Sequence, residues 1–362
     1  MESTAGAKRV CLLPGDGIGP EVLDQAVAVM ERVAGHAGLN IVTRTEAIGG
    51  AALDRFNTPL TEETLQACAA SDAVLLGAVG GPAWDDRPAD LRPEKGLLRL
   101  RKGLGLYANL RPVRLIPALL EGSTLRPEVI RGVDLVVVRE LTGGLYYGEP
   151  RGISGTHGAE IGMNTMVYTR PEIERIARVA FELALRRRAV LTSVDKANVL
   201  EVSVLWRRII EETHANYPGV TLNHMYVDNC AMQMVLKPRQ FDVILTENTF
   251  GDILSDIGGV LAGSIGTLPS ASIGQGTALY EPVHGSAPDI AGRGCANPIG
   301  AICCVAMMFE LSFNRTDLAR RIVRAVDQTL EDGYRTRDLP GSDSMKVGTR
   351  DFGGKVLERL EP

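Results

Sequence analysis

The alternation of short β-branched segments with longer amphipathic segments is the feature that most constrains the fold of this chain. Strands are expected near residues 8–13, 40–45 and 73–79, and helices at about 20–35 and 61–70. A helical crossover returns the chain to the same edge of a sheet, so repeated strand and helix units build a parallel sheet. The N-terminal part of the sequence therefore predicts an α/β fold.

The same alternation continues through the rest of the chain, with two interruptions. Five further segments are candidate strands: VDLVVVREL, EIGMNTMVYT, AVLTSVD, VTLNHMYVD and FDVILTEN. Further helices are expected at about 171–188, 199–216, 251–262, 298–312 and 315–332. Residues 80–96 contain three prolines and three glycines and predict a long loop. After residue 263 a segment rich in Gly, Ser and Ala interrupts the pattern a second time.

Length and charge exclude several classes of function. The chain has 362 residues, 45% of them apolar, which suits two domains or one large α/β unit. A net charge of −5, with acids and bases interleaved, offers no basic stripe for nucleic acid or an anionic membrane, so neither is expected as a partner. The N-terminus lacks an apolar signal segment, and the six cysteines lack metal-ligand spacing. We therefore expect a reducing, cytoplasmic location.

The sequence GDGIGPEV, at residues 15–22, lies between an expected strand and an expected helix. Gly15, Gly17 and Gly19 form G-x-G-x-G, whereas the dinucleotide fingerprint requires G-x-G-x-x-G. Pro20 stands where proline commonly begins a helix. The loop therefore predicts a tight turn ending at a helix N-terminus, and a nucleotide site needs other evidence.

Two aspartates in GDILSDIGG are candidate metal ligands. Asp252 and Asp256 are four residues apart, so on a helix both carboxylates project from one face. Their repulsion is relieved by a cation between them, and Mg²⁺ or Mn²⁺ requires further oxygen ligands. Asp228, at the end of an expected strand, is the third candidate. The alternative is a solvated helix face and an unrelated turn aspartate.

Three arginines indicate an acidic substrate. Arg139 closes a very apolar segment, where an unpaired guanidinium would be costly, and Arg101 and Arg111 are the other two candidates. Arginine binds carboxylates through two parallel hydrogen bonds. Together with the aspartates, these residues favour a small dicarboxylate or tricarboxylate bound beside a cation. Alternatively, each arginine forms an ordinary ion pair.

Seven motifs, in this order and over nearly the whole chain, carry a resemblance to a known family: GDGIGPEV, NLRPV, LTGGLYYGEPRG, SVDKANVLE, YVDNCAMQ, TENTFGDILSDIGG and EPVHGSAPDIAG. The sequence resembles the β-decarboxylating dehydrogenases, which include the isocitrate and isopropylmalate dehydrogenases. The resemblance implies a two-domain α/β fold that is not Rossmann, with a discontinuous cofactor domain at 1–106 plus 263–362. A substrate, metal and dimerisation domain would occupy 107–262. Residues near 141–167 would form an arm that interlocks a homodimer with shared active sites.

The resemblance also implies roles for the candidate residues. One subunit would contribute Asp252 and Asp256, and its partner Asp228, as ligands of Mg²⁺ or Mn²⁺. Arg101, Arg111 and Arg139 would bind the substrate carboxylates. Lys196 from the partner would act as the base and Tyr146 would protonate the enol carbon after decarboxylation. Outside this context Lys196 is a lysine at a helix start and Tyr146 an ordinary buried tyrosine.

Substrate and cofactor follow from the same resemblance. Glu94, Leu97 and Leu98, with Val199 of the partner, would form an apolar wall suited to an isopropyl group, so the expected reaction is oxidative decarboxylation of 3-isopropylmalate in leucine biosynthesis. The implied contacts of the cofactor are Ile18, Glu281, His284, Gly285, Ser286, Ala287, Asp289 and Asn297. The carboxylate of Asp289 would accept from the ribose hydroxyls and repel a 2′-phosphate, which favours NAD. The C-terminal segment is less typical of the family than the rest of the chain. The resemblance therefore carries less weight for a cofactor contact from Asp338.

Three alternatives stay open at this point. The first is a tartrate, malate, homoisocitrate or isocitrate dehydrogenase on the same skeleton, against which the leucine pair argues. The second is a catalytically silent subunit of a hetero-oligomer, against which Tyr146, Lys196 and the three aspartates argue. The third is a cation- or phosphate-binding module without redox chemistry, which would leave the arginines unexplained.

Overall fold

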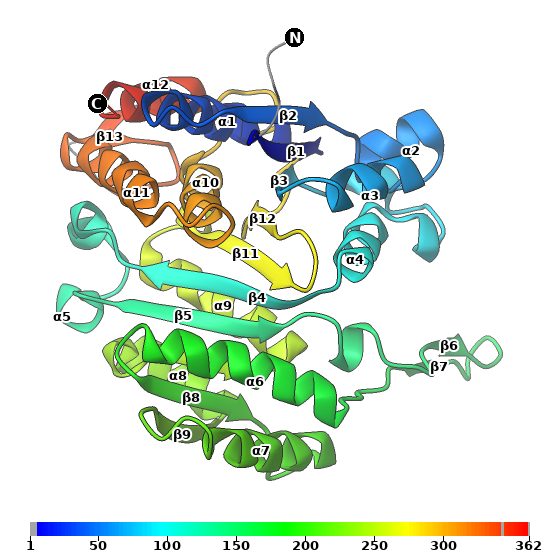
Figure 1. The fold of residues 1–362 in the computed structure, drawn as a ribbon. Coiled ribbons are helices and arrows are strands. Elements are labelled where there is room, and N and C mark those ends of the chain that lie inside the picture. The colour runs from blue at the N-terminus through cyan, green and yellow to red at the C-terminus, as the bar shows by residue number, and fades with distance from the viewer. Residues whose placement is uncertain (1–5, 342–343, 361–362) are drawn as a thin grey trace. The chain divides into compact units, whose positions relative to one another are not determined.

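The computed structural model describes residues 6–341 and 344–360, which divide into two compact units. Unit 1 comprises Met1–Leu106, Leu115–Pro127 and Ala262–Pro362, and unit 2 comprises Tyr107–Arg114 and Glu128–Leu261. Figure 1 shows the elements of each unit coloured along the chain. Strands alternate with helices in both, which confirms the α/β class. No helix among the described residues is long and apolar enough to cross a membrane.

The main strands of unit 1 pair in the order β2-β1-β3-β12-β11. Their bounds are β1 Lys8–Gly15, β2 Ile41–Thr45, β3 Ala73–Ala78, β11 Pro269–Gly274 and β12 Leu279–Pro282. β1 is parallel to β2 and β3, and β12 is parallel to β3 but antiparallel to β11. Every residue of β3 is buried, as expected for a central strand covered on both faces.

Helices cover the strands of unit 1. They are α1 Gly19–His36, α2 Gly50–Phe56, α3 Glu62–Ala69, α4 Pro93–Gly103, α10 Ile299–Leu311, α11 Thr316–Glu331 and α12 Thr349–Glu358. α10 is apolar around most of its circumference and packs against α1, α11, β11 and β12. A helix that is apolar on all sides needs such burial. Short elements complete the unit: η1 Pro82–Trp84, η2 Ala89–Leu91, η3 Pro117–Gly122, η6 Ile265–Thr267, β13 Tyr334–Arg335 and β14 Met345–Lys346.

The main strands of unit 2 pair in the order β4-β5-β10-β8-β9. Their bounds are β4 Leu106–Arg114, β5 Asp134–Glu140, β8 Val190–Asp195, β9 Thr221–Tyr226 and β10 Val243–Thr246. β4 runs antiparallel to β5, and the other neighbours are parallel. The helical elements are α5 Pro127–Ile130, η4 Gly144–Tyr146, α6 Arg170–Leu185, α7 Glu201–His214, α8 Val227–Leu236, η5 Pro238–Gln240 and α9 Asn248–Ala262.

A two-stranded hairpin stands apart from the main strands of unit 2. It consists of β6 (Gly152–Ser154) and β7 (Ile161–Met163), paired antiparallel, and Figure 1 shows it at the end of an extended connection. All six strand residues are exposed, and the side chain of Ile153 is 83% exposed. An exposed apolar hairpin of this kind is typical of a surface that another chain covers.

Several local predictions are wrong in detail. The expected loop 80–96 contains η1 and η2 and ends in α4, because Pro93 begins a helix whose inner face is buried. The expected strand 160–169 is reduced to β7, because Thr169 and Glu172 form a capping box that starts α6. The strand expected to reach residue 228 ends at Tyr226, and α8 follows directly.

The division into units differs from the expected domain ranges at Leu115–Pro127, which belongs to unit 1. The η3 segment there packs against α11. In addition, Arg335 donates from Nη2 to the carbonyl oxygen of Ala118 at 2.9 Å. These contacts attach the segment to the C-terminal helices of unit 1.

Candidate active site

Two acids and two arginines meet in unit 2. Asp252 and Asp256 lie one turn apart on α9, while Arg139 is the last residue but one of β5 and Arg111 lies on β4. Arg139 Nη1 donates to Asp252 Oδ1, and Arg111 Nη1 lies 3.6 Å from the same oxygen. Arg111 Nη1 is also 4.0 Å from Asp256 Oδ1. The structure thus brings together four of the predicted site residues.

The pairing of β4 with β5 explains why the two arginines share a face. Asn109 lies opposite Arg139, and Arg111 follows two residues later on the same strand. Residues two apart on a strand point to the same face, so Arg111 and Arg139 are diagonal neighbours. Both guanidinium groups are buried, at 8% and 3% exposure. Their positive charges therefore act through a medium that screens them weakly.

Tyr146, at the end of η4, completes this cluster. Its hydroxyl donates to Asp252 Oδ2 at 2.9 Å. Burial, reinforced by the carboxylate of Asp252, raises the pKa of Tyr146 to about 12. The phenol therefore holds its proton near neutral pH, as a proton donor requires.

The two aspartates differ in their ionisation. Burial opposes the charge on Asp252, but Arg139, Arg111 and the Tyr146 hydroxyl together hold its pKa below the usual value. The pKa of Asp256 is raised, because burial and the charge of Asp252 outweigh the attraction of Arg111. A cation between the carboxylates would relieve this repulsion.

The donor chemistry of this pair fits Mg²⁺ or Mn²⁺. Both side chains offer hard carboxylate oxygens one helical turn apart. Among residues 6–341 and 344–360 no group of three or more His, Cys, Asp or Glu side chains is arranged to hold a metal. The remaining ligands would therefore come from substrate, water or another chain.

Lys196 and Asp228 form a second cluster in unit 2. Lys196 follows β8, and Asp228 lies in the first turn of α8. Lys196 Nζ donates to Asp228 Oδ1 at 2.8 Å, and this contact lowers the pKa of Asp228. The Asp228 side chain is 65% exposed, and Val199, in the loop before α7, is 69% exposed. These residues lie on the surface of the protomer, accessible to a partner.

Helix α4 of unit 1 carries the predicted substrate wall. Arg101 and Gly96 are buried in it, Leu97 and Leu98 are half-buried, and Glu94 is exposed. Arg101 Nη2 donates to Glu281 Oε1 at 2.5 Å, and both side chains are about nine-tenths buried. Glu281, for which the resemblance implies a cofactor contact, is thus directly paired with Arg101, for which it implies a substrate contact.

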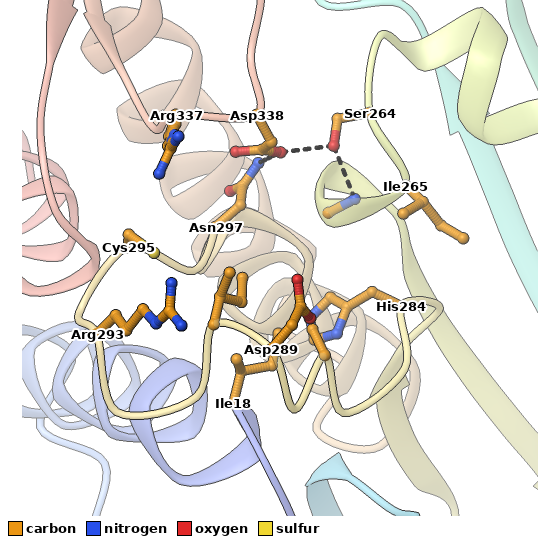
Figure 2. Close-up of a pocket in the computed structure, with 13 residues that line it drawn as sticks. Ile18, Ser264, Ile265, His284, Asp289, Arg293, Cys295, Asn297, Arg337 and Asp338 are labelled. Atoms are coloured by element: carbon orange, nitrogen blue, oxygen red, sulfur yellow. Dashed lines mark hydrogen bonds between the residues drawn. The ribbon is translucent and has the colours of Figure 1, made fainter. Parts of the chain in front are cut away.

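Unit 1 also contains a cavity of about 610 Å³, shown in Figure 2. Five of the predicted cofactor residues line it: Ile18, His284, Ala287, Asp289 and Asn297. Asp338, about which the sequence was less informative, lines it too and accepts from Ser264 Oγ at 2.6 Å and from Asn297 Nδ2 at 3.0 Å. Gly285, Ser286 and Glu281 do not line the cavity.

The glycine loop is packed against the segment that contains Ser286. Ile18 N donates to the Ser286 carbonyl oxygen at 2.8 Å. A Cβ atom on Gly17, whose φ is +57°, would lie 2.0 Å from the same oxygen. Asp16 fixes the loop from the other side by accepting backbone hydrogen bonds from Gly50 and Gly80, both at 2.8 Å. The glycines therefore serve a close contact between two backbone segments.

His284, one of the residues that line the cavity, has an unsatisfied polar atom. Burial lowers the pKa of His284, so the ring is neutral near pH 7. Nδ1 hydrogen bonds to the carbonyl oxygen of Gly285 at 2.9 Å, while the buried Nε2 has no partner among the described residues. A buried polar atom without a partner is costly. A nucleotide that contacted Nε2 would remove this cost.

Sequence reasoning missed two arginines and a cysteine in this cavity. Arg293, Arg337 and Cys295 line it, and Figure 2 shows them along one side. In the described part of the chain, neither arginine forms an ion pair. Periodicity carries no signal for them, because they lie in irregular segments that only the fold brings together.

Comparison with known proteins decides the family. A family model described as isocitrate/isopropylmalate dehydrogenase matches residues 9–356. The chain belongs to this family. The family membership that the seven motifs predict is therefore confirmed. Because members of this family are dehydrogenases, the alternative of a binding module without redox chemistry is disfavoured.

Individual relatives of this dehydrogenase are similar over their full length. A 3-isopropylmalate dehydrogenase of Aquifex aeolicus is 57% identical over 353 residues, covering 98% of this chain and 97% of that protein. One of Gloeobacter violaceus is 55% identical, covering 98% and 99%. Among solved structures, the isocitrate dehydrogenase from Methylococcus capsulatus superposes with a TM-score of 0.86 at 39% identity, covering 98% of this chain and 99% of that chain.

Proposed function

We propose that this dehydrogenase converts 3-isopropylmalate and NAD to 4-methyl-2-oxopentanoate, CO₂ and NADH, a step of leucine biosynthesis in the cytoplasm. The observation that carries the proposal is the position of Asp252, whose two oxygens contact Arg139 and the Tyr146 hydroxyl. A cation ligand, a carboxylate-binding group and a proton donor thus meet at one point. The names of the relatives at 57% and 55% identity support 3-isopropylmalate as the substrate.

Each site residue has its own role in the proposed reaction. When bound, a divalent ion would polarise the C2 oxygen and NAD would accept the hydride from C2. Arg101, Arg111 and Arg139 bind the substrate carboxylates. Lys196 takes the proton of the C2 hydroxyl, directly or through water. After the bond between C3 and its carboxylate breaks, Tyr146 donates a proton to C3, and its high pKa keeps that proton in place until then.

The ligand sets follow from the same proposal. Mg²⁺ or Mn²⁺ binds Asp252 and Asp256, with Asp228 of the partner subunit. NAD would occupy the 610 Å³ cavity, which His284 and Asp289 line. Glu94, Leu97 and Leu98, with the partner's Val199, surround the isopropyl group. The half-buried state of both leucines supports an apolar wall.

A homodimer is required by this arrangement, because Lys196 and Asp228 serve the site of the other subunit. Exposed apolar side chains on two helices support such an interface. On α8 these are Met232 (56% exposed) and Leu236 (62%), and on α9 Ile253 (56%) and Val260 (51%). The β6-β7 hairpin, with Ile153 exposed, would act as the interlocking arm.

The test is NADH formation by the purified protein with NAD, Mg²⁺ and 3-isopropylmalate. Isocitrate, malate and tartrate are assayed in parallel, and EDTA is the metal control. We expect turnover mainly of 3-isopropylmalate, abolished by EDTA and restored by added Mg²⁺. Preference for another acid would contradict the apolar wall but keep the family chemistry, and no turnover of any acid would favour a silent subunit.

A further inference from the structure

We propose that Asn248 is a positioning residue, which fixes the Arg139 guanidinium and the loop before Tyr146 relative to each other. This inference rests on the proposed function. Asn248 begins α9 directly after β10 and is 1% exposed. Its Oδ1 accepts from Arg139 Nε at 3.0 Å and from Arg139 Nη2 at 2.8 Å. Two donors on one edge of the guanidinium are thus fixed, and the Nη1 donor points to Asp252.

The other end of the same amide holds the backbone beside Tyr146. Asn248 Nδ2 donates to the carbonyl oxygen of Gly143 at 3.1 Å, and Gly143 directly precedes η4. The backbone N–H of Asn248 donates to the Tyr168 hydroxyl at 3.0 Å. One side chain therefore links the end of β5, the start of α9 and the loop that carries the proton donor.

Asn248 is the first residue inside α9, so it does not act as the N-cap, the role for which asparagine is ordinarily favoured at the start of a helix. Glu247 takes that role, because its carboxylate accepts from Phe250 N at 2.6 Å and from Thr249 N at 3.0 Å. Both polar atoms of the Asn248 side chain are therefore committed to Arg139 and Gly143. Helix formation alone does not explain this residue.

The charge of the side chain also matters. An amide offers an acceptor to Arg139 and a donor to Gly143 without adding a charge. Aspartate would have no donor for the Gly143 carbonyl and would place a second carboxylate beside the guanidinium. The neutral amide adds no negative charge to the one that Asp252 already brings to Arg139, so a substrate carboxylate meets less repulsion there.

The experiment compares Asn248→Ala and Asn248→Ser with the unmodified protein and with Asn216→Ala. Asn216 serves as the matched control, because it lies in the same unit beyond the end of α7, where its Nδ2 donates to the Thr213 carbonyl oxygen. Steady-state kinetics give kcat and the KM values for 3-isopropylmalate and NAD. Calorimetry measures binding of 3-isopropylmalate with Mg²⁺, and circular dichroism checks folding.

We expect Asn248→Ala to raise the KM and the Kd for the acid at least about tenfold, as is usual when a hydrogen bond to a charged group is lost. The KM for NAD should change less than twofold, and Asn216→Ala should resemble the unmodified protein. A merely structural role would change both KM values together. Asn248→Ser, which keeps one hydroxyl but cannot bridge both partners, supplies the test if the alanine variant does not fold.

Unchanged KM and Kd for the acid in a folded Asn248 variant, with an active unmodified protein, would overturn this inference alone. If the unmodified protein prefers isocitrate, malate or tartrate, the proposed substrate is wrong, and the same comparison with that acid decides the role of Asn248. Absence of turnover with all four acids would overturn both proposals.

Discussion

The buried pair of Arg101 and Glu281 gives a stability prediction whose size follows from the structure. The side chains are 11% and 10% exposed, and Nη2 and Oε1 are 2.5 Å apart. Replacing Glu281 by alanine leaves a buried guanidinium without its carboxylate. Breaking a buried pair from one side costs about 3–5 kcal/mol, because the remaining charge cannot be solvated. We expect Glu281→Ala to lower the free energy of unfolding by this amount.

The same helix provides the control. Arg99, two residues before Arg101 on α4, pairs with Glu62 at 3.1 Å, but the two side chains are 51% and 63% exposed. Exposed pairs contribute less than about 1 kcal/mol, since water solvates either charge alone. Glu62→Ala should therefore be nearly neutral. Arg101→Leu combined with Glu281→Leu should recover most of the loss, because no charge is then left buried.

Urea unfolding followed by circular dichroism measures these differences from the midpoint and slope of each transition. The protomer concentration must be the same for every variant, because association of subunits shifts apparent stability. The reasoning would be refuted if Glu281→Ala lost less than about 1 kcal/mol, or if Glu62→Ala lost as much as Glu281→Ala.

Three further predictions concern the cavity in unit 1. Gly17→Ala should lower stability by about 1–3 kcal/mol, measured by urea unfolding, and weaken NAD binding in calorimetry, because the new Cβ meets the Ser286 carbonyl at 2.0 Å and φ is +57°; unchanged NAD affinity would contradict this contact. NAD at about one hundred times its Kd should slow alkylation of Cys295 about a hundredfold, followed by mass spectrometry, while Cys303 on α10 serves as the unprotected reference; equal rates with and without NAD would remove the cofactor from this cavity. Asp289→Asn should strengthen NADP binding about fivefold, since removing one exposed like charge at about 4 Å changes the free energy by about 1 kcal/mol, and calorimetry with no such gain would contradict the assigned role of Asp289.

The position of the acids was predictable from the sequence because it depends on one helix. A spacing of four residues is enough to place Asp252 and Asp256 on one face, and α9 does so. The neighbouring arginines were predictable as residues but not as a pair. β4 was not predicted as a strand, since the polar sequence NLRPVR lies within it. Without that strand, the sequence cannot show that Arg111 and Arg139 are diagonal neighbours on paired strands.

Contacts between segments that are distant in the chain could not be predicted from the sequence, for a different reason. Arg101 and Glu281 are 180 residues apart, and neither helix periodicity nor strand alternation relates them. The sequence carried no signal for Asn248, because the helix was expected from about residue 251 and the partners of Asn248 come from β5 and from the loop before η4.

The charge balance of the cluster in unit 2 supports the proposal that a cation and an acidic substrate bind there together. Asp252, which is half-buried, and Asp256, whose side chain is 62% exposed, face two buried arginines, Arg111 and Arg139, so these four side chains together are neutral when fully ionised. A dicarboxylate alone would add negative charge beside the aspartates, and a divalent cation alone would add positive charge beside the arginines. Either addition is unfavourable where water screens weakly. Together they cancel, so the site can exchange its internal ion pairs for contacts with cation and substrate without leaving an uncompensated charge.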